Sequence, residues 1–409
     1  MTHLRIARKL AIAVLLAGCG PSAAGPSTSA SAPSIAPTSV PSTTVTVAPP
    51  TINPLALLPA LPAGSLDAKT SAALQKVLDN LVAAGAPDAI GAVITTNGQW
   101  AGAAGVDGPN GRAADPADMF NVASTSKTVL AALVLRLAQD GRMDLDAPLS
   151  TYLGDVPVDA NGATVRQALG MRSGITDTPS AIQAEARADC SHVWSRTEML
   201  RSIPSPNGTP GTTIQYSNPT YKLLGLAAER VTGKPLETAY QELEFGPMGV
   251  TGVLEQNQTH ATPKPWALPI AGHEGSLDLA AYGTGGTLPC LSLTTFSFQN
   301  AVAATAPNLA RWGWDLFSGG LIDQQSLAAM TTVQAGDSPD DPDLFGLGIE
   351  GVPDFYFGTR AFAAAGSQVG YKSFMAILPD RQVVAVVLIN DDGADAEGGA
   401  KRLVAALGT

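Results

Sequence analysis

Charged side chains are missing from the first part of this 409-residue chain. From Leu10 to Leu66 there is no Asp, Glu, Lys or Arg. Over the whole chain 35 acidic residues outnumber 24 basic ones, the net charge is −11, and no cluster of Lys and Arg follows Lys9. Such an acidic chain repels nucleic-acid phosphates, so we expect no nucleic-acid partner. The 45% hydrophobic content instead predicts a globular protein with a large core.

Long apolar runs are also missing. The apolar stretch Leu10–Leu16 is too short to span a bilayer as a helix, and no later stretch approaches ~18 uninterrupted apolar residues. Arg5, Arg8 and Lys9 precede this stretch, in the order typical of a secretory signal peptide. We therefore expect an exported chain without a transmembrane helix.

A cysteine motif ends the apolar stretch. Leu16-Ala17-Gly18-Cys19 resembles the lipobox of bacterial lipoproteins. That resemblance implies cleavage after Gly18 and attachment of lipid, such as palmitate, to the sulfur of Cys19. It also implies a protein anchored in the cell membrane and facing the extracytoplasmic side. The alternative is an ordinary secretory signal that happens to contain a cysteine.

The segment from Gly20 to Ser65 consists mostly of Ser, Pro, Thr, Ala and Val. It lacks the periodic apolar face that a core requires, so we expect a disordered or polyproline-like linker. Its expected role is to hold a globular head away from the membrane within the cell envelope. The predicted domains are thus a signal peptide 1–18, a lipidated cysteine with a flexible tether 19–65, and a head 66–409.

Cysteines are few in the head. Only Cys190 and Cys290 follow Cys19. In an exported chain, two remaining cysteines predict one disulfide. By chain-entropy reasoning, closing a loop of about 100 residues stabilises the fold by roughly 4 to 5 kcal/mol. Two unpaired buried thiols are the alternative.

The apolar periodicity of the head predicts a sheet built from both ends of the chain. The expected elements are helices 66–84 and 394–407 and strands 89–95, 99–106, 372–378 and 382–389. An Asn97-Gly98 turn joins the first two strands. The sequence between these ends is mostly helical. We therefore predict an α/β (α+β) fold with two lobes: an antiparallel sheet flanked by helices, and an inserted α-rich lobe at roughly 128–315, with a cleft between them.

A Ser-x-x-Lys sequence occurs once, at Ser124 and Lys127, just before the apolar helix body 129–137. Residues three apart share one face of a helix, so these two side chains can touch. A serine hydroxyl needs a base to become a good nucleophile, and a buried lysine can be that base. The helix N-terminus also offers backbone N–H groups to a developing oxyanion.

The only Tyr-x-Asn sequence is Tyr216-Ser217-Asn218, which precedes a helix expected at about 221–231. A tyrosine beside an ammonium group has a lowered pKa and can pass protons to a leaving group. Asn218 can donate to a substrate carbonyl and accept from Lys127. An ordinary helix-capping loop is the alternative for this motif taken alone.

Three further segments accompany these two motifs. They are Asp140–Ser150, Thr164–Ile175 and Leu309-Ala310-Arg311-Trp312. Together the motifs resemble the serine beta-lactamase-related family, which includes class C beta-lactamases, DD-carboxypeptidases and related esterases; the resemblance covers about residues 67–407. It implies a beta-lactamase/transpeptidase-like fold and a two-step acyl transfer. Ser124 would form the acyl-enzyme, with Lys127 and Tyr216 as general base and acid and Asn218 positioning the substrate.

The third motif of that family, His-x-Gly or Lys-Thr-Gly, falls on Ala364-Ala365-Gly366 when counted back from Gly370-Tyr371. By the resemblance, Gly366 and Ser367 contact substrate, and the backbone N–H of Ser367 completes an oxyanion hole with that of Ser124. The basic residue of the motif is absent, because Ala364 takes its place.

This missing cation bears on the substrate. In the family it favours a substrate carboxylate, so its loss argues against efficient processing of beta-lactams or D-Ala-D-Ala peptides. Lys372 or Arg172 could replace the charge, although a solvated surface position is the simpler interpretation of each. The histidines His192, His260 and His273 are far from Ala364 in sequence.

The leading interpretation is an exported, membrane-anchored serine hydrolase that acts through an acyl-enzyme on an ester or amide. Cell-wall peptide, lipid or a small ester are possible substrates. The alternative is a penicillin-binding-like or catalytically impaired binding protein of the cell envelope, and a third class is an anchored interaction module with an unused cleft. There is no Gly-x-Ser-x-Gly elbow and no clustered set of metal ligands, so we expect neither a metal nor an organic cofactor. The sequence does not fix the oligomeric state.

Overall fold

A computed structural model describes residues 55–107, 111–188, 195–249, 302–335, 344–368 and 370–408. The predicted signal peptide, Cys19, Cys190 and Cys290 lie outside these residues, so lipidation and the disulfide stay predictions. No helix in the described ranges combines the length and the apolar character needed to cross a membrane.

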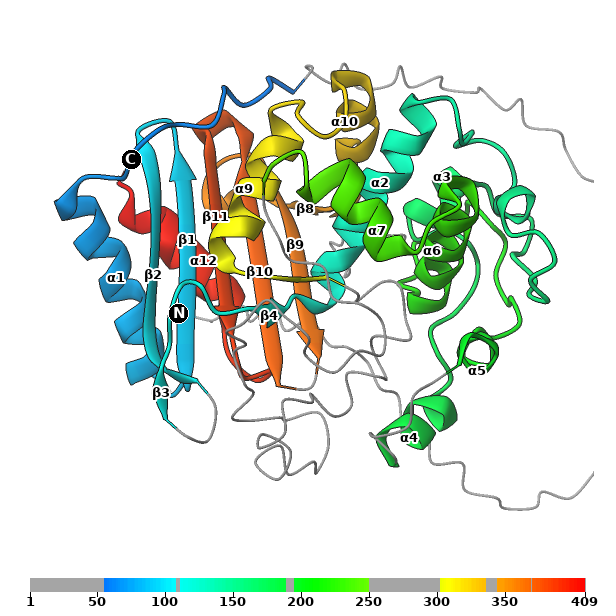
Figure 1. The fold of residues 1–409 in the computed structure, drawn as a ribbon, viewed down its shortest axis with the longest axis horizontal. Coiled ribbons are helices and arrows are strands. Elements are labelled where there is room, and N and C mark those ends of the chain that lie inside the picture. Colours follow the sequence, from blue (N-terminus) through cyan, green and yellow to red (C-terminus); the bar gives the residue numbers. More distant parts are fainter. Residues whose placement is uncertain are drawn as a thin grey trace, which may run out of the picture. The chain divides into compact units, whose positions relative to one another are not determined.

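An antiparallel sheet forms the centre of the fold (Figure 1). Within the described residues it has nine strands in the order β3-β2-β1-β11-β10-β9-β8-β7-β6. The long strands are β1 (Asp88–Thr95), β2 (Gly98–Asp107), β9 (Ala361–Gln368), β10 (Tyr371–Leu378) and β11 (Val383–Ile389). The short ones are β3 (Arg112–Ala113), β6 (Gln334–Ala335), β7 (Leu344–Phe345) and β8 (Glu350–Val352). Ile90 of β1 lies opposite Leu388 of β11, so the two chain ends meet in mid-sheet as predicted.

Helices cover both faces of the sheet because its central strands are apolar on both sides. Every residue of β11 is buried, as expected of a strand covered on two faces. On one face, Val383, Ala385, Val387 and Ile389 join a core with α1 (Ala68–Ala83) and α12 (Ala396–Ala406). On the other, the alternate residues of β11 join the core that contains α9 (Ala306–Phe317). The helical lobe was expected to reach roughly residue 315. It ends before α9, because α9 packs on the sheet.

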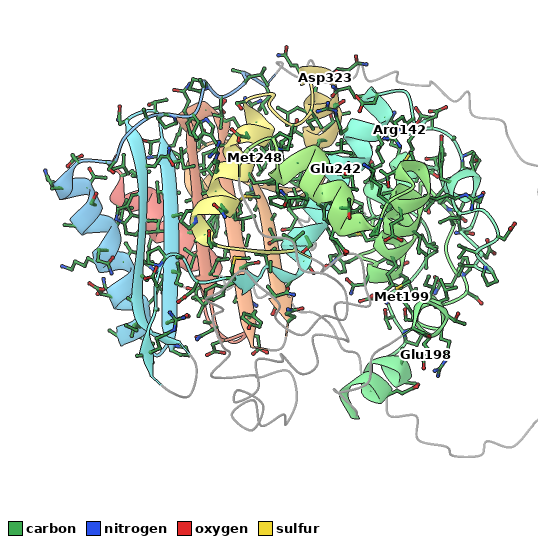
Figure 2. All side chains as sticks on the ribbon, viewed as in Figure 1. Arg142, Glu198, Met199, Glu242, Met248 and Asp323 are labelled. Atoms are coloured by element: carbon green, nitrogen blue, oxygen red, sulfur yellow. The ribbon has the colours of Figure 1, made fainter. Side chains whose placement is uncertain are left out.

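The second lobe is helical and is inserted between β4 and β5, two short strands that pair with each other. These are Phe120–Asn121 and Ala303–Ala304. The α-helices described within the insertion are α2 (Ser126–Gln139), α3 (Val165–Leu169), α4 (Ser180–Ala188), α5 (Arg196–Leu200), α6 (Asn218–Thr232) and α7 (Leu236–Tyr240). Besides α1, α9 and α12, the described helices outside the insertion are α10 (Gln324–Thr331), which contacts α2, and α11 (Asp354–Phe357). Figure 2 labels the exposed side chains of Arg142, Glu242 and Asp323 and the buried side chains of Met199 and Met248.

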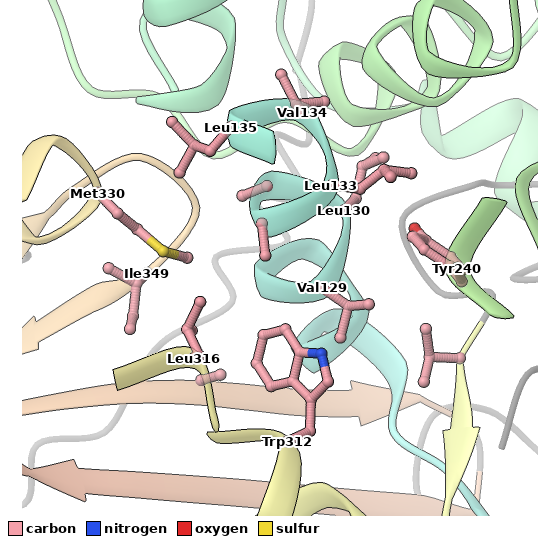
Figure 3. Close-up of a cluster of buried hydrophobic side chains, with 14 of the residues drawn as sticks. Val129, Leu130, Leu133, Val134, Leu135, Tyr240, Trp312, Leu316, Met330 and Ile349 are labelled. Carbon is pink, nitrogen blue, oxygen red and sulfur yellow. The ribbon is translucent and has the colours of Figure 1, made fainter. Parts of the chain in front are cut away.

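Helix α2 is the buried axis between the two lobes. Ten consecutive residues from its start are buried, as is Leu137. Figure 3 shows α2 with its neighbours from four other segments: Trp312 and Leu316 of α9, Tyr240 of α7, Met330 of α10, and Ile349. Burying one such aliphatic side chain contributes about 1.5–3 kcal/mol, so this packing fixes the position of the helix firmly.

The last part of the predicted tether is wrong, because residues 55–65 pack on the head. Leu55 and Leu58 are buried, and Leu58 N donates to Phe317 O at 2.8 Å. The indole Nε1 of Trp314 donates to Pro59 O at 2.9 Å. The compact unit that contains the sheet begins at Asn53. Lack of charge suggested a linker here, but the leucines supply apolar contacts that the preceding Ser/Thr-rich sequence lacks.

Candidate active site

Ser124 lies in a tight turn that three neighbouring segments hold in place. The turn is a 3-10 helix, Ala123–Thr125, directly before α2. Val122 N donates to Val302 O at 3.1 Å, and Asn121 Oδ1 accepts from Ala123 N at 2.7 Å. Ala123 has φ of 48°, a left-handed conformation uncommon outside glycine. A strained backbone next to a nucleophile is typical of functional sites, where the surrounding contacts maintain it.

Strands β9 and β10 also pack against the turn Ala123–Thr125 that carries the nucleophile. The hydroxyl of Ser373 on β10 donates to Val122 O at 2.8 Å and lies 2.9 Å from Thr125 Oγ1. On β9, a Cβ at Gly366 would come within 2.2 Å of Val122 O, so only glycine allows this approach. Gly366 therefore packs against the nucleophile turn rather than lining the pocket. Ser367 follows it in β9, opposite Lys372.

The three predicted catalytic residues meet at one atom. Lys127 Nζ donates to Ser124 Oγ at 2.9 Å, and the hydroxyl of Tyr216 donates to the same oxygen at 2.7 Å. Lys127 Nζ is also 4.8 Å from the centroid of the Tyr216 ring. A serine oxygen held between a lysine and a tyrosine can pass its proton to one and receive help for the leaving group from the other.

Burial makes Lys127 a plausible base. Its side chain is 3% exposed, and this desolvation lowers the pKa of Lys127 to about 7. Asp177 raises that pKa, Lys222 lowers it, and Glu350 raises it to a smaller extent. Near neutral pH a large fraction of Lys127 is therefore uncharged, which is the form that can accept the proton of Ser124.

A pocket opens at this catalytic group, between the helical lobe and the sheet. It is lined by Ser124, Lys127, Thr128, Tyr216, Phe345, Gly348, Glu350, Ala363, Ala364 and Ala365. Within the described residues, β8 pairs with β9 only from Ala361 to Ala363, and Ala363, Ala364 and Ala365 of β9 line the pocket. The cleft thus lies where the sequence predicted it, with α2 on one side and β9 on the other.

Ala364 occupies the position of the basic residue in the family's third motif, so the pocket has no cation there. Ala364 is buried at the pocket wall. Arg172 does not replace the cation there, because its guanidinium donates to Gly211 O at 3.2 Å. Lys372 does not either: Ser373 points to the nucleophile turn, and adjacent strand residues point to opposite faces. His192, His260 and His273 lie outside the described residues.

Asn218 departs from its expected contact. Its Nδ2 donates to Asp177 Oδ2 at 3.1 Å and its backbone N to Asp177 Oδ1 at 3.2 Å. Its Oδ1 is buried and accepts no hydrogen bond from the described residues, so the expected bond from Lys127 is absent. Asn218 opens α6, where Ser217 caps the helix by accepting from Thr220 N, and Asp177 fixes the orientation of the amide.

Three charged residues around the site were not predicted from the sequence. Lys222 on α6 is 1% exposed and donates to Ser202 Oγ at 2.5 Å; burial lowers its pKa to about 7, while Asp177 raises it. A lysine inside the apolar run 221–228 was the available signal for it. Asp177 and Glu350 gave no such signal, because one lies in a loop and the other in a three-residue strand. The described residues contain no group of three or more His, Cys, Asp or Glu that could hold a metal.

Known proteins share this fold and sequence pattern. The family model named Beta-lactamase matches residues 74–409. Protein flp of Staphylococcus aureus is 25% identical over 201 residues, which cover 47% of this chain but only 36% of that protein. The Escherichia coli D-alanyl-D-alanine-carboxypeptidase/endopeptidase AmpH is 24% identical over 66% of this chain and 70% of its own length. The D-stereospecific amidohydrolase of a Streptomyces species has a TM-score of 0.67 and 25% identity, over 81% of this chain and 97% of that one.

Proposed function

Because the chain belongs to the beta-lactamase family, we propose that it is a serine hydrolase that forms an acyl-enzyme on Ser124 from an amide or ester. The observation that carries this proposal is the convergence of Lys127 Nζ and the Tyr216 hydroxyl on Ser124 Oγ, at 2.9 and 2.7 Å. No physical requirement of the fold alone places a buried lysine and a half-exposed tyrosine on one serine oxygen.

The acylation step follows from this arrangement. Uncharged Lys127 accepts the proton of Ser124 as Oγ attacks the carbonyl carbon, and the carbonyl oxygen becomes an oxyanion. The backbone N–H groups of Ser124 and Ser367 are the proposed donors to that oxyanion. Tyr216 then gives its proton to the departing amine or alkoxide, the bond to the leaving group breaks, and the proton held by Lys127 restores the tyrosine.

Deacylation uses the same groups in reverse. Water attacks the ester carbonyl while uncharged Lys127 takes its proton. The bond to Ser124 Oγ then breaks, and the proton held by Lys127 passes to Oγ to restore the serine hydroxyl. The names of two relatives, a D-alanyl-D-alanine-carboxypeptidase/endopeptidase and a D-stereospecific amidohydrolase, favour an amide over a simple ester as the natural substrate. The absence of a cation at Ala364 disfavours substrates with a carboxylate beside the scissile bond.

The proposed location of this enzyme is the outer side of the cell membrane. The N-terminal basic and apolar segment followed by Cys19 supports a lipid anchor, and the uncharged sequence after it supports a spacer. Metabolic labelling with a palmitate analogue tests the anchor: label should appear in the full chain and disappear in Cys19→Ser. Label retained in that variant would contradict the assignment.

Two active-site probes test the proposed reaction. We expect a fluorophosphonate probe to label the full-length protein, Ser124→Ala to abolish labelling, and a fluorescent penicillin to label weakly, because it presents a carboxylate. Stable penicillin labelling without turnover of esters or amides would favour the alternative, a penicillin-binding-like protein. Absence of labelling by both probes in correctly folded protein would rule the hydrolase out.

A further inference from the structure

The carboxylate of Asp177 lies at the start of α6, the helix that follows Tyr216, and the proposed reaction gives it no role. One carboxylate oxygen accepts from the backbone N of Asn218 at 3.2 Å, and the other accepts from Asn218 Nδ2 at 3.1 Å. The first oxygen also accepts from Thr178 N at 2.7 Å. This carboxylate therefore faces the N-terminus of α6, where backbone N–H groups and the helix dipole favour a negative charge.

The loop that carries Asp177 holds the chain on both sides of Tyr216. Before the tyrosine, Gln215 N donates to Met171 O at 2.7 Å. After it, Asp177 accepts the two hydrogen bonds at the start of α6. Between these two attachments, the Tyr216 hydroxyl reaches Ser124 Oγ at 2.7 Å. Asp177 therefore helps to set where the phenol meets the nucleophile.

The negative charge of Asp177 also acts on both buried lysines of the site. Burial has the largest effect on the pKa of Lys127 and lowers it; of the charged groups that act on this lysine, Asp177 comes first and raises its pKa. Lys222 lowers the pKa of Lys127, and Glu350 raises it to a smaller extent. Burial likewise lowers the pKa of Lys222, and Asp177 raises it. The Tyr216 ring faces Lys127 as well, with its centroid 4.8 Å from Nζ.

Acylation creates a positive charge in a buried place. When Ser124 Oγ attacks the carbonyl carbon, its proton moves to the amine of Lys127, whose side chain is only 3% exposed. A buried ammonium group is costly unless an anion stabilises it. In serine hydrolases with a histidine base, a carboxylate orients that base and stabilises the cation formed on it, without taking the proton itself. At this site, the carboxylate of Asp177 is suited to the same task.

We propose that Asp177 is a positioning residue with two linked tasks. It holds the Tyr216–Asn218 segment against the nucleophile, and its carboxylate stabilises the ammonium form of Lys127 that acylation produces. The proton from Ser124 stays on Lys127 until it restores Tyr216, and Asp177 takes none. This inference rests on the proposed function, because it concerns the same acyl transfer.

A purely structural role for Asp177 is the competing explanation. A carboxylate at the start of α6 stabilises that helix whatever the reaction does, so its loss would lower the Tm and slow catalysis at every pH. Such a loss would not change the pH at which the nucleophile becomes active. Stabilisation of the Lys127 ammonium does affect that pH, because removing the anion makes the amine less basic.

The test measures how fast a neutral fluorophosphonate labels Ser124 at a series of pH values in the full-length protein, since this probe requires no knowledge of the natural substrate. Asp177→Asn and Asp177→Ser remove the charge but keep an oxygen that can accept from Asn218 N. Asp177→Glu keeps the charge. The matched control is Asp67→Asn, because Asp67 accepts from two backbone N–H groups at the start of α1, which packs on the other face of the sheet.

We expect the native labelling rate to fall about tenfold per pH unit below the pKa of Lys127, which is about 7. In Asp177→Asn and Asp177→Ser, the pH at which this fall begins should be lower by roughly 0.5 to 1 pH unit, the scale for loss of a nearby opposite charge. Above that pH, their labelling should be roughly three- to tenfold slower than native, because a less basic amine accepts the proton less readily. Asp177→Glu and Asp67→Asn should keep the native pH dependence.

The outcomes separate this inference from the proposed function. A native pH dependence in the uncharged variants, with Ser124 still labelled, overturns the inference and leaves the proposed function standing. An equal displacement in Asp177→Glu also overturns it, because the shape of the side chain rather than its charge would then be responsible. Failure of the native protein to react with the probe overturns both. The Tm of each variant identifies one that does not fold, and the other uncharged variant then decides.

Discussion

The two sides of the catalytic pocket differ in what they retain of the family pattern. The helical side keeps Lys127 and Tyr216 within hydrogen-bond distance of Ser124. The strand side keeps the glycine that lets β9 approach the nucleophile turn, but has Ala364 in place of a cation and adds Glu350. The residues proposed to make and break bonds thus lie on different structural elements from those at the third-motif position, so one set can change while the other is maintained.

This separation has a physical basis in how each side is built. The helical side depends on α2, whose apolar residues are buried between the lobes, so small displacements there cost packing energy. The strand side depends on side chains that face the pocket from a backbone fixed by sheet pairing. Replacing one of them changes the charge of the pocket without changing the course of the strand.

Removing the nucleophile gives the largest expected effect on this comparison. Ser124→Ala should reduce hydrolysis of every substrate by at least about 10³-fold, regardless of substrate charge, because no acyl-enzyme can form. Intact-protein mass spectrometry after exposure to substrate should show no acyl adduct. Residual activity within tenfold of the native value would show that another residue is the nucleophile.

Removing the phenol comes next. Tyr216→Phe should lower kcat by roughly 10²- to 10⁴-fold for amides, the range for loss of a general acid. Esters of p-nitrophenol, whose leaving group needs no proton, should lose much less. Tyr152→Phe is the matched control, since its hydroxyl accepts from Asp144 N on the surface of the helical lobe. Equal losses for amides and activated esters would argue against the acid role.

Restoring the missing cation should affect the strand side alone. Ala364→Lys should increase the rate of acylation by a fluorescent penicillin by roughly tenfold, because the ammonium group would face the carboxylate of that probe. The rate with a neutral fluorophosphonate should change much less. A parallel change in both rates would mean that the two sides of the pocket are not separable.

The smallest expected effect is a displacement of the pH profile. Because the neutral form of Lys127 is the base and its pKa is about 7, kcat/KM for an uncharged ester should fall about tenfold per pH unit below pH 7. Lys222→Met removes a charge that lowers the pKa of Lys127, so the pH below which kcat/KM falls should become higher. Glu350→Gln removes a charge that raises the pKa of Lys127, so the pH below which kcat/KM falls should become lower. Shifts in one common direction would contradict this electrostatic account.

Sequence reasoning succeeded where a pattern has one physical cause. The continuous apolar run of β11 admits little but a central strand, and Ser124 and Lys127 three apart at a helix start admit contact on one face. Both were predicted and both are found. The meeting of Tyr216 with these residues, 92 positions away in the chain, needed the family resemblance, because spacing alone cannot bring it to Ser124.

The misses have physical causes as well. Asn218 was expected to accept from Lys127 through Oδ1, but Asp177 accepts from both its Nδ2 and its backbone N–H and so fixes the amide, and no sequence pattern places Asp177 beside it. Glu350 belongs to a strand too short to show periodicity, so no sequence pattern places it at the pocket. The segment 55–65 was assigned to the tether from its lack of charge, although its leucines pack against α9.

The packing of residues 55–65 on α9 has a practical consequence for how a soluble form of the protein should be designed. A version that begins at Leu66, just before charge returns at Asp67, would lose Leu55 and Leu58 and remove the carbonyl partner of the Trp314 indole. The uncovered face of α9 would then be an exposed apolar patch prone to aggregation. A version that begins before Asn53 keeps this apolar face of α9 covered.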